Sequence, residues 1–216
     1  MKSLLRIRDP LDPKDGQRNG LEMVGQPSLE FVNTQSLFQM TSELSTLIHG
    51  FKYRQLKRHI PFLCQYLRFR PLLLKDLEDV DALVPVPIHP IRFRERGYNQ
   101  AEVIAREVSK IVGKPVITDL LVRNRNTKSQ TKLTREARRQ NLKQAFSLPN
   151  SNRLVGQRVL LIDDVFTTGA TAAACGELLW KAGCQSVRFF SLAKVDVVEG
   201  RGDFDLEMMA LTGFLT

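Results

Sequence analysis

The chain has 216 residues, of which 43% are hydrophobic and 25% charged, a composition typical of one globular domain with an appendage. No apolar run approaches the roughly 18 residues of a membrane span, and the N-terminus lacks the apolar region of a secretory signal. The three cysteines, Cys64, Cys175 and Cys184, have no metal-ligand spacing. They predict buried thiols in a reducing cytoplasm.

The formal net charge of +9 is concentrated in two basic segments. Residues 44–75, the first basic segment, carry seven Lys or Arg and no acid; residues 123–143, the second, carry eight against Glu136 alone. The remainder of the chain is therefore acidic. Such segments favour phosphate-bearing partners, although surface Lys and Arg also serve solubility.

The N-terminal part of the chain is predicted to be irregular over residues 1–40, because turn signals recur there without apolar periodicity. A helical segment is predicted over residues 41–78, with Ser42 as a cap and Pro61 in a first turn. Apolar residues recur there at helical spacing in two sets: Leu44, Leu47, Ile48 and Phe51, then Ile60, Leu63, Cys64 and Leu67.

From residue 79 to residue 216 the pattern alternates between strands and helices. The predicted elements are a strand over 81–87, a helix over 98–112, a strand over 115–122, a helix over 134–145, a strand over 159–162, a helix over 170–182 and a strand over 186–193. The run at 159–162 is apolar without alternation, as in a parallel strand covered on both faces. We therefore expect an α/β domain with a parallel sheet flanked by helices.

A polar cluster follows the predicted strand at 159–162. Asp163 and Asp164 come at its carboxyl end, where parallel sheets bind ligands. The next residues provide hydroxyl groups, a glycine and amides at a helix N-terminus, which favour an anion: Thr167, Thr168, Gly169, Ala170 and Thr171. The two acids suit sugar hydroxyls, a metal, or both. A sugar phosphate satisfies both halves of the cluster.

Three other interpretations explain this cluster less well than a sugar-phosphate site does. A helix start alone would explain two acids and one capping threonine, but not three threonines around a glycine. A receiver domain would need four further strand-helix units, and the 52 residues after Asp164 are too few. A P-loop kinase is excluded because the chain lacks its phosphate-binding motif.

The stretch V-L-L-I-D-D-V-F-T-T-G-A-T at 159–171 resembles the signature of type I phosphoribosyltransferases. The resemblance implies phosphoribosyl pyrophosphate as the ligand, with Mg²⁺ bound through the ligand and not directly by the protein. It assigns the ribose hydroxyls to Asp163 and Asp164. The 5-phosphate would be bound by Thr167, Thr168, Gly169, Ala170 and Thr171.

Two further segments, residues 84–100 and 123–146, resemble the ComF family of DNA-uptake competence proteins, as does the segment L-I-H-G-F-K-Y-R at 47–54. The resemblance spans residues 44–193. ComF proteins usually begin with a cysteine-rich zinc module, but the first 43 residues here contain no cysteine. We therefore expect no zinc in this chain.

The resemblance also implies two loops around the ligand. The first, residues 87–97, contains Arg92, Arg94 and Arg96, and Arg96 is the predicted pyrophosphate ligand because it opens the matching motif R-G-Y-N-Q-A. The second, residues 123–135, would close over the reaction centre. Its candidate catalytic cations are Lys128, Lys132 and Arg135, and the sequence does not select among them.

Two functions remain open from the sequence. The first is a ComF-type protein that binds phosphoribosyl pyrophosphate in DNA uptake and natural transformation, alongside other uptake proteins, in the cytoplasm or peripherally at the inner membrane. The second is an active transferase that moves phosphoribose to a nitrogenous acceptor in nucleotide metabolism.

The first basic segment is the candidate contact for single-stranded DNA. Its candidate cations are Lys52, Arg54, Lys57 and Arg58, interspersed with aromatic residues: Phe51, Tyr53, Phe62, Tyr66 and Phe69. The alternative interpretation places these aromatic residues in the core of amphipathic helices.

Overall fold

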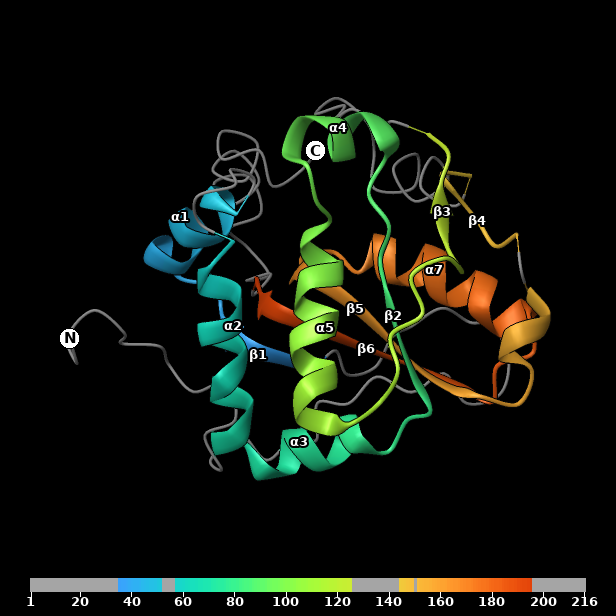
Figure 1. The fold of residues 1–216 in the computed structure, drawn as a ribbon, viewed down its shortest axis with the longest axis horizontal. Coiled ribbons are helices and arrows are strands. Elements are labelled where there is room, and N and C mark those ends of the chain that lie inside the picture. The colour runs from blue at the N-terminus through green and yellow to red at the C-terminus, as the bar shows by residue number, and fades with distance from the viewer. Residues whose placement is uncertain (1–34, 52–56, 126–143, 150, 196–216) are drawn as a thin grey trace, which may run out of the picture.

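A computed structural model describes residues 35–51, 57–125, 144–149 and 151–195 of the chain. Its centre is a four-stranded sheet in the order β1-β6-β5-β2, with every neighbouring pair parallel (Figure 1). The strands are β1 (Gln35–Gln39), β2 (Ala82–Pro85), β5 (Arg158–Phe166) and β6 (Ser186–Lys194). The predicted α/β fold with a parallel sheet is therefore confirmed.

Helices cover both faces of this sheet, which explains the unbroken apolar run in β5. Successive strand residues point to opposite faces. Leu160 and Ile162 belong to one core cluster with α5 (Gln100–Val112). Val159 and Leu161 belong to a second cluster with α7 (Ala170–Lys181). Both faces of β5 are buried under helices here, so apolar residues are required at every position of the run.

The helical segment that precedes the sheet shares the first of these two cores. It comprises α1 (Ser42–Gly50), α2 (His59–Cys64), the 3-10 helix η2 (Gln65–Phe69) and α3 (Pro71–Glu78). Buried Ile48 and Ile60 lie in the same cluster as Leu83 of β2, and α2 runs beside α5 in Figure 1. Both predicted helices form, although the N-cap is Thr41, whose Oγ1 accepts from the amide of Leu44 at 3.2 Å.

Strand β1 departs from the prediction that residues 1–40 are irregular. Its five residues, Q-S-L-F-Q, are too short to show a period, and they form a strand because β6 offers an unpaired edge. Side chains hold β1 in place: the Ser36 and Ser191 hydroxyls lie 2.7 Å apart, and Gln35 donates to Asp76 at 2.8 Å.

The strand expected over residues 115–122 does not form, and this prediction is wrong. Val116 makes only an isolated parallel bridge to Leu83, and the chain then enters β3 (Val122–Arg123), which pairs antiparallel with β4 (Phe146–Ser147). Most of the helix predicted at 134–145 lies outside the described residues.

The loop after β2 was expected to be irregular but contains the short helix α4 (Pro90–Arg96). His89 caps this helix through Nδ1, which accepts from the amide of Ile91 at 3.2 Å. No helix in the described ranges is long and apolar enough to cross a membrane.

Candidate phosphoribosyl-binding site

The acidic pair lies on a part of β5 that extends past its neighbour. The pairing of β2 with β5 ends at Pro85 opposite Ile162, whereas β6 continues to pair with β5 as far as Phe166. Asp163 and Asp164 therefore stand at the carboxyl edge of the sheet, beyond the last paired residue of β2. This edge is where an open parallel sheet binds its ligands.

The two carboxylates have different surroundings. Asp163 interacts electrostatically with Arg123. Burial, and then the charge of Asp163, raise the pKa of the Cys175 thiol in α7. Asp164 interacts with Arg96 and Tyr98, which lie at the junction of α4 and α5. The pair thus stands between two groups of residues, one from the β3-β4 hairpin and α7, the other from the α4-α5 region.

Asp163 is held in an electrostatically unfavourable position. It is half-buried, and its Oδ1 accepts from the amide of Asp164 at 2.9 Å. Loss of water contact, and then the charge of Asp164, raise the pKa of Asp163 well above its ordinary value, while Arg123 acts in the opposite direction. Hydroxyl donors or a cation from a ligand would stabilise the ionised form of this carboxylate.

The loop after the acidic pair forms the start of α7. Gly169 is the N-cap residue with φ 74°, a left-handed conformation that glycine adopts without strain. Having no side chain, it cannot cap the amides of the first turn, which remain available for an anion. The rest of the predicted phosphate loop surrounds this turn: Thr167 and Thr171 are half-buried, Thr168 is exposed, and Ala170 begins the helix.

The R-G-Y-N-Q motif provides the residues near Asp164. Arg96 ends α4 and is half-buried; its burial lowers the pKa of Arg96, and the nearby Asp164 raises it. Asn99 fastens the loop, because its Nδ2 donates to the carbonyl of Val86 at 2.9 Å and its Oδ1 accepts from the amide of Ala101 at 3.1 Å. Sequence reasoning did not identify this role for Asn99.

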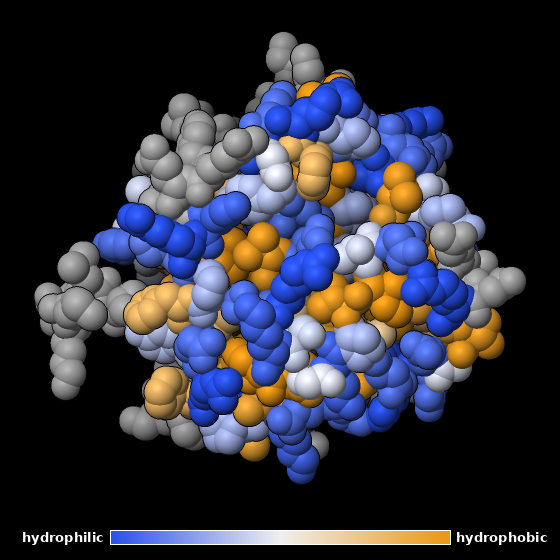
Figure 2. Space-filling view, in the orientation of Figure 1, coloured by the Kyte–Doolittle hydropathy of each residue, from blue (hydrophilic) through white to orange (hydrophobic). Residues whose placement is uncertain are grey.

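The three arginines of this region differ in position. Arg96, the predicted pyrophosphate ligand, lies in electrostatic range of Asp164. Arg92 is half-buried and forms an ion pair with Glu95 at 3.7 Å, whereas Arg94 is exposed. In Figure 2, hydrophilic residues gather at this end of the molecule, over α4.

Two residues at the site were not predicted to belong to it. Tyr98 is buried, and burial together with the charge of Asp164 raises the pKa of Tyr98 to about 12. Arg123 of β3 is the first residue of the second predicted loop but was not selected as a candidate, yet it lies within electrostatic range of Asp163. Tyr98 belongs to the R-G-Y-N-Q-A motif but was given no role. Both residues come near the acidic pair through contacts between distant parts of the chain, which the sequence does not show.

The candidates in the two basic segments are only partly described. Lys52 and Arg54, like Lys128, Lys132 and Arg135, lie outside the described residues. Lys57 and Arg58 are exposed immediately before α2. The Lys57 Nζ lies 5.5 Å from the ring centroid of Tyr98, so the first basic segment reaches the edge of the site.

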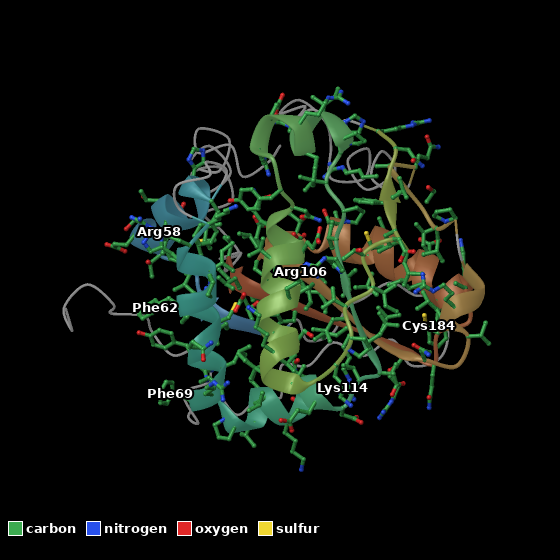
Figure 3. All side chains as sticks on the ribbon, viewed as in Figure 1. Arg58, Phe62, Phe69, Arg106, Lys114 and Cys184 are labelled. Carbon is green, nitrogen blue, oxygen red and sulfur yellow. The ribbon has the colours of Figure 1, made fainter. Side chains whose placement is uncertain are left out.

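The aromatic residues of the first basic segment divide between core and surface. Phe51 is fully buried, as the core interpretation expects. Phe62 and Phe69 are 53% and 77% exposed. Tyr66 lies between them in edge contact with both rings, and its ring centroid is 5.7 Å from that of Phe62 and 6.3 Å from that of Phe69. Figure 3 places Phe62 and Phe69 on one edge of the molecule, below Arg58. We call Phe62, Tyr66 and Phe69 the aromatic ridge.

Comparisons with known proteins found a matching family and similar relatives. The phosphoribosyl transferase domain family matches residues 97–205. The chain is 36% identical over 156 residues to Competence protein F of Haemophilus influenzae, covering 70% of this chain and 68% of that protein. It is 30% identical over 154 residues to DNA utilization protein YhgH of Escherichia coli strain K12, covering 70% and 67%.

A solved structure, a purine phosphoribosyltransferase from Pyrococcus horikoshii, matches with 20% identity and a TM-score of 0.38, covering 68% of this chain and 79% of that one. The matched family region contains the acidic pair, the threonine loop and Arg123. Fold and site therefore define a type I phosphoribosyltransferase-like domain. The chain belongs to the ComF family of proteins built on this domain.

Proposed function

We propose that this protein binds phosphoribosyl pyrophosphate at the carboxyl edge of its sheet and takes part in DNA uptake. The observation that carries the first half is the acidic pair on the extended end of β5, directly before the helix start at Gly169. Carboxylates at one end and free amides at the other match a ribose that carries a 5-phosphate.

The ligand would be held by three groups of residues. Asp163 and Asp164 take the ribose hydroxyls, and the 5-phosphate is bound by Thr167, Thr168, Gly169, Ala170 and Thr171. Arg96, next to Asp164, takes the pyrophosphate. The carboxylates thus face the uncharged hydroxyls of the ligand, and the helix amides and Arg96 face its two anionic ends.

Magnesium is the metal that would accompany this ligand, bound through the ligand's phosphate oxygens and not directly by the protein. Mg²⁺ prefers oxygen ligands and keeps part of its hydration while it binds phosphate oxygens. Asp163 and Asp164 are the carboxylates beside the expected pyrophosphate position, and in the described part of the chain no group of three metal-binding side chains competes with them. When bound, the ion would neutralise the pyrophosphate.

Calorimetric titration tests this assignment. Phosphoribosyl pyrophosphate should bind to the full chain in the presence of Mg²⁺ and more weakly with a chelator. Ribose 5-phosphate should bind weakly under both conditions because it lacks the pyrophosphate. Absence of binding by phosphoribosyl pyrophosphate with Mg²⁺ would remove the proposal.

The DNA part of the proposal is supported by the names of the relatives, a competence protein and a DNA utilization protein. It is also supported by the aromatic ridge. Bases stack on exposed aromatic rings while nearby cations contact the phosphates. Around the ridge, Lys57, Arg58 and Arg68 are exposed, and residues 57–75 contain no acid.

Fluorescence anisotropy with a labelled single strand tests the ridge. Replacing both exposed rings, Phe62→Ala with Phe69→Ala, should weaken binding by about 10-fold or more, since stacking contributes roughly 1–3 kcal/mol per base. The control is Leu72→Ala, which removes an aliphatic side chain that is 76% exposed. An equal loss in the control, or a flat dependence on salt, would contradict a stacking surface with phosphate contacts.

A second candidate function is phosphoribosyl transfer to a nitrogenous acceptor. It is favoured by the family match, which covers the whole acidic pair and threonine loop. Pyrophosphate release upon addition of purine or pyrimidine bases would establish it. Binding of the ligand without release would favour a role for the site in DNA uptake alone.

A further inference from the structure

Helix α4 is fixed at both ends but buries none of its side chains. His89 caps its start, and at its end Gly97, with φ 76°, donates from its amide to the carbonyl of Phe93 at 2.7 Å. Beyond the helix, Asn99 donates back to the carbonyl of Val86, which precedes it, at 2.9 Å. The side chains of α4 therefore stand on a backbone that is already ordered.

Two large apolar side chains of α4 are exposed to solvent. Phe93 is 47% exposed and Ile91 is 38% exposed. No residue of α4 belongs to either core cluster, so packing does not explain an aromatic ring at this position. Single exposed apolar residues are common on protein surfaces, and a role for Phe93 depends on what surrounds it.

The charge of α4 favours an anionic partner. The helix has three arginines and one acid. Arg92 forms an ion pair with Glu95 at 3.7 Å, and Arg96 is the proposed pyrophosphate ligand. Arg94, which is exposed, is therefore the arginine that remains for a further anion. An exposed ring beside an exposed cation suits an unstacked base and its phosphate.

A contact between Lys57 and Tyr98 joins α4 to the first basic segment. The Lys57 Nζ lies 5.5 Å from the ring centroid of Tyr98, which is two residues beyond the end of α4. In Figure 3, Phe62 and Arg58 follow one another along one edge of the molecule, in the direction of α4. Because residues 57–75 contain no acid, nothing in that segment opposes an anion on the way from the aromatic ridge to α4.

We propose that α4 extends the DNA-binding surface, so that one single strand runs from the aromatic ridge past Lys57 to Phe93 and Arg94. This inference rests on the proposed function, because the ridge is its starting point. A base stacks on the ring of Phe93, and Arg94 contacts a neighbouring phosphate. The rings at both ends of the path lie on ordered helices, which lowers the entropic cost of binding.

The length of the ridge sets the length of strand that can reach α4. Lys57 lies twelve residues before Phe69, and most of the residues between them are helical. This separation is about 20 Å at rises of about 1.5–2.0 Å per residue. Stacked nucleotides follow one another at about 3.4 Å, so about six of them extend from Phe69 to Lys57. A strand must be longer than this to occupy the whole ridge and reach α4.

Fluorescence anisotropy with labelled single strands of about 5 and about 15 nucleotides tests this path. Phe93→Ala should weaken binding of the long strand by about 5-fold or more, because one stacking contact is lost, and binding of the short strand by less than about 2-fold. Arg94→Gln should reduce the slope of log affinity against log salt for the long strand by about 0.7, the value for one phosphate contact. Thermal melts show whether both variants are folded.

Two variants away from this surface are the matched controls. Val155→Ala removes an apolar side chain that is 69% exposed and lies just before β5, at the opposite edge of the sheet. Arg106→Gln removes an exposed positive charge from α5, where Arg106 pairs with Glu102 at 2.7 Å. Neither control should change the affinity for the long strand by more than about 2-fold.

The outcomes separate this inference from the function on which it rests. Equal losses for the two strand lengths in Phe93→Ala, or an equal loss in the controls, would contradict the path. Unchanged affinity of a folded Phe93→Ala protein for the long strand would remove α4 from the DNA surface. If that variant instead lost flotation with phosphatidylserine vesicles, or self-association in sedimentation, α4 would belong to a lipid surface or to a second copy of the chain. A wild-type protein that binds no strand would refute the proposed DNA function, and this inference with it.

Discussion

At the scale of one residue, Asp163 lowers the stability of the fold at the position where we propose that it binds a ligand. Its carboxyl group is half-buried next to Asp164, and its pKa is raised well above the ordinary value. A buried group with a raised pKa favours the folded state when it is protonated and disfavours it when it is charged. At neutral pH, where the same carboxyl group is ionised in the unfolded chain, the raised pKa of Asp163 therefore costs stability. This cost is the kind found at binding sites.

We expect Asp163→Asn to be more stable than the wild-type protein at neutral pH while losing ligand binding. The gain should shrink as the pH falls toward the ordinary carboxyl pKa of about 4, because Asp163 is then protonated in the unfolded as well as the folded wild-type chain. Each unit of raised pKa corresponds to about 1.4 kcal/mol, and each kcal/mol to about 2–4 °C in the melting temperature of a domain this size. Thermal melts across pH check this; a variant that is less stable at pH 7 than wild type would contradict it.

Residue identities at the site were predictable where the information is local. Asp163 to Thr171 form one strand-turn-helix, so the sequence pattern places the acids and the threonine loop without knowledge of the rest of the fold. Arg123 was not predictable as a residue near Asp163, because its position depends on a two-residue strand that pairs with Phe146 more than twenty positions away. Tyr98 likewise reaches Asp164 only through the packing of α5 on the sheet.

At the scale of elements, the start of α7 depends on the conformation of Gly169. Its φ of 74° is left-handed, and an added Cβ would lie 3.0 Å from Cζ of Phe166. Phe166 in turn packs on Phe189 with ring centroids 5.5 Å apart, which limits how far the ring can move. The conformation of the proposed phosphate-binding turn therefore depends on the core behind it.

Gly169→Ala should lower the free energy of unfolding by about 1–2 kcal/mol, the cost of a left-handed alanine, and should weaken ligand binding. Gly113→Ala is the control: it has φ 70°, nothing within 4 Å of its added Cβ, and a position at the C-terminal end of α5. It should show a similar loss in denaturant unfolding with normal ligand affinity. If Gly113→Ala weakened ligand binding equally, the local explanation would be wrong.

The long periodic elements were predictable, and the short ones were not. Helix α5 and strand β6 form where apolar periodicity and turn signals place them, because their own residues supply the core. Strand β5 forms at the predicted position but continues to Phe166, because β6 still pairs with it there. Strand β1 and helix α4 are set by their neighbours: β1 adds to the edge of β6, and α4 begins at the His89 cap. Such short segments have no period of their own to detect.

At the scale of the whole molecule, the helical segment and the sheet depend on one core. Ile60 of α2 is fully buried in the cluster that also contains Leu83, Ile104 and Leu160. Truncation of Ile60 should therefore destabilise the sheet and the ligand site together, although α2 contributes no predicted ligand contact.

Ile60→Ala should lower the free energy of unfolding by about 2–5 kcal/mol, the usual cost of a buried cavity of this kind. The exposed Leu72→Ala should change it by less than about 0.5 kcal/mol. Far-ultraviolet circular dichroism and protection by ligand should report one transition. Two separate transitions would mean that residues 41–78 fold independently of the sheet.

The same packing places the two proposed binding functions side by side. Lys57 contacts the ring of Tyr98, which lies within electrostatic range of Asp164. The aromatic ridge begins at Phe62, five residues further along the same segment. The ridge and the acidic pair nevertheless use different residues, so loss of one should leave the other largely intact.

The most direct test of the account is to measure both affinities on one variant, Asp163→Ala with Asp164→Ala. Calorimetry with phosphoribosyl pyrophosphate and Mg²⁺ should show binding by the wild-type protein and none by the variant. Anisotropy with single-stranded DNA should give nearly the same affinity for both proteins. Retained ligand binding in the variant, or an equal loss of both affinities in a variant that is still folded, would contradict the account.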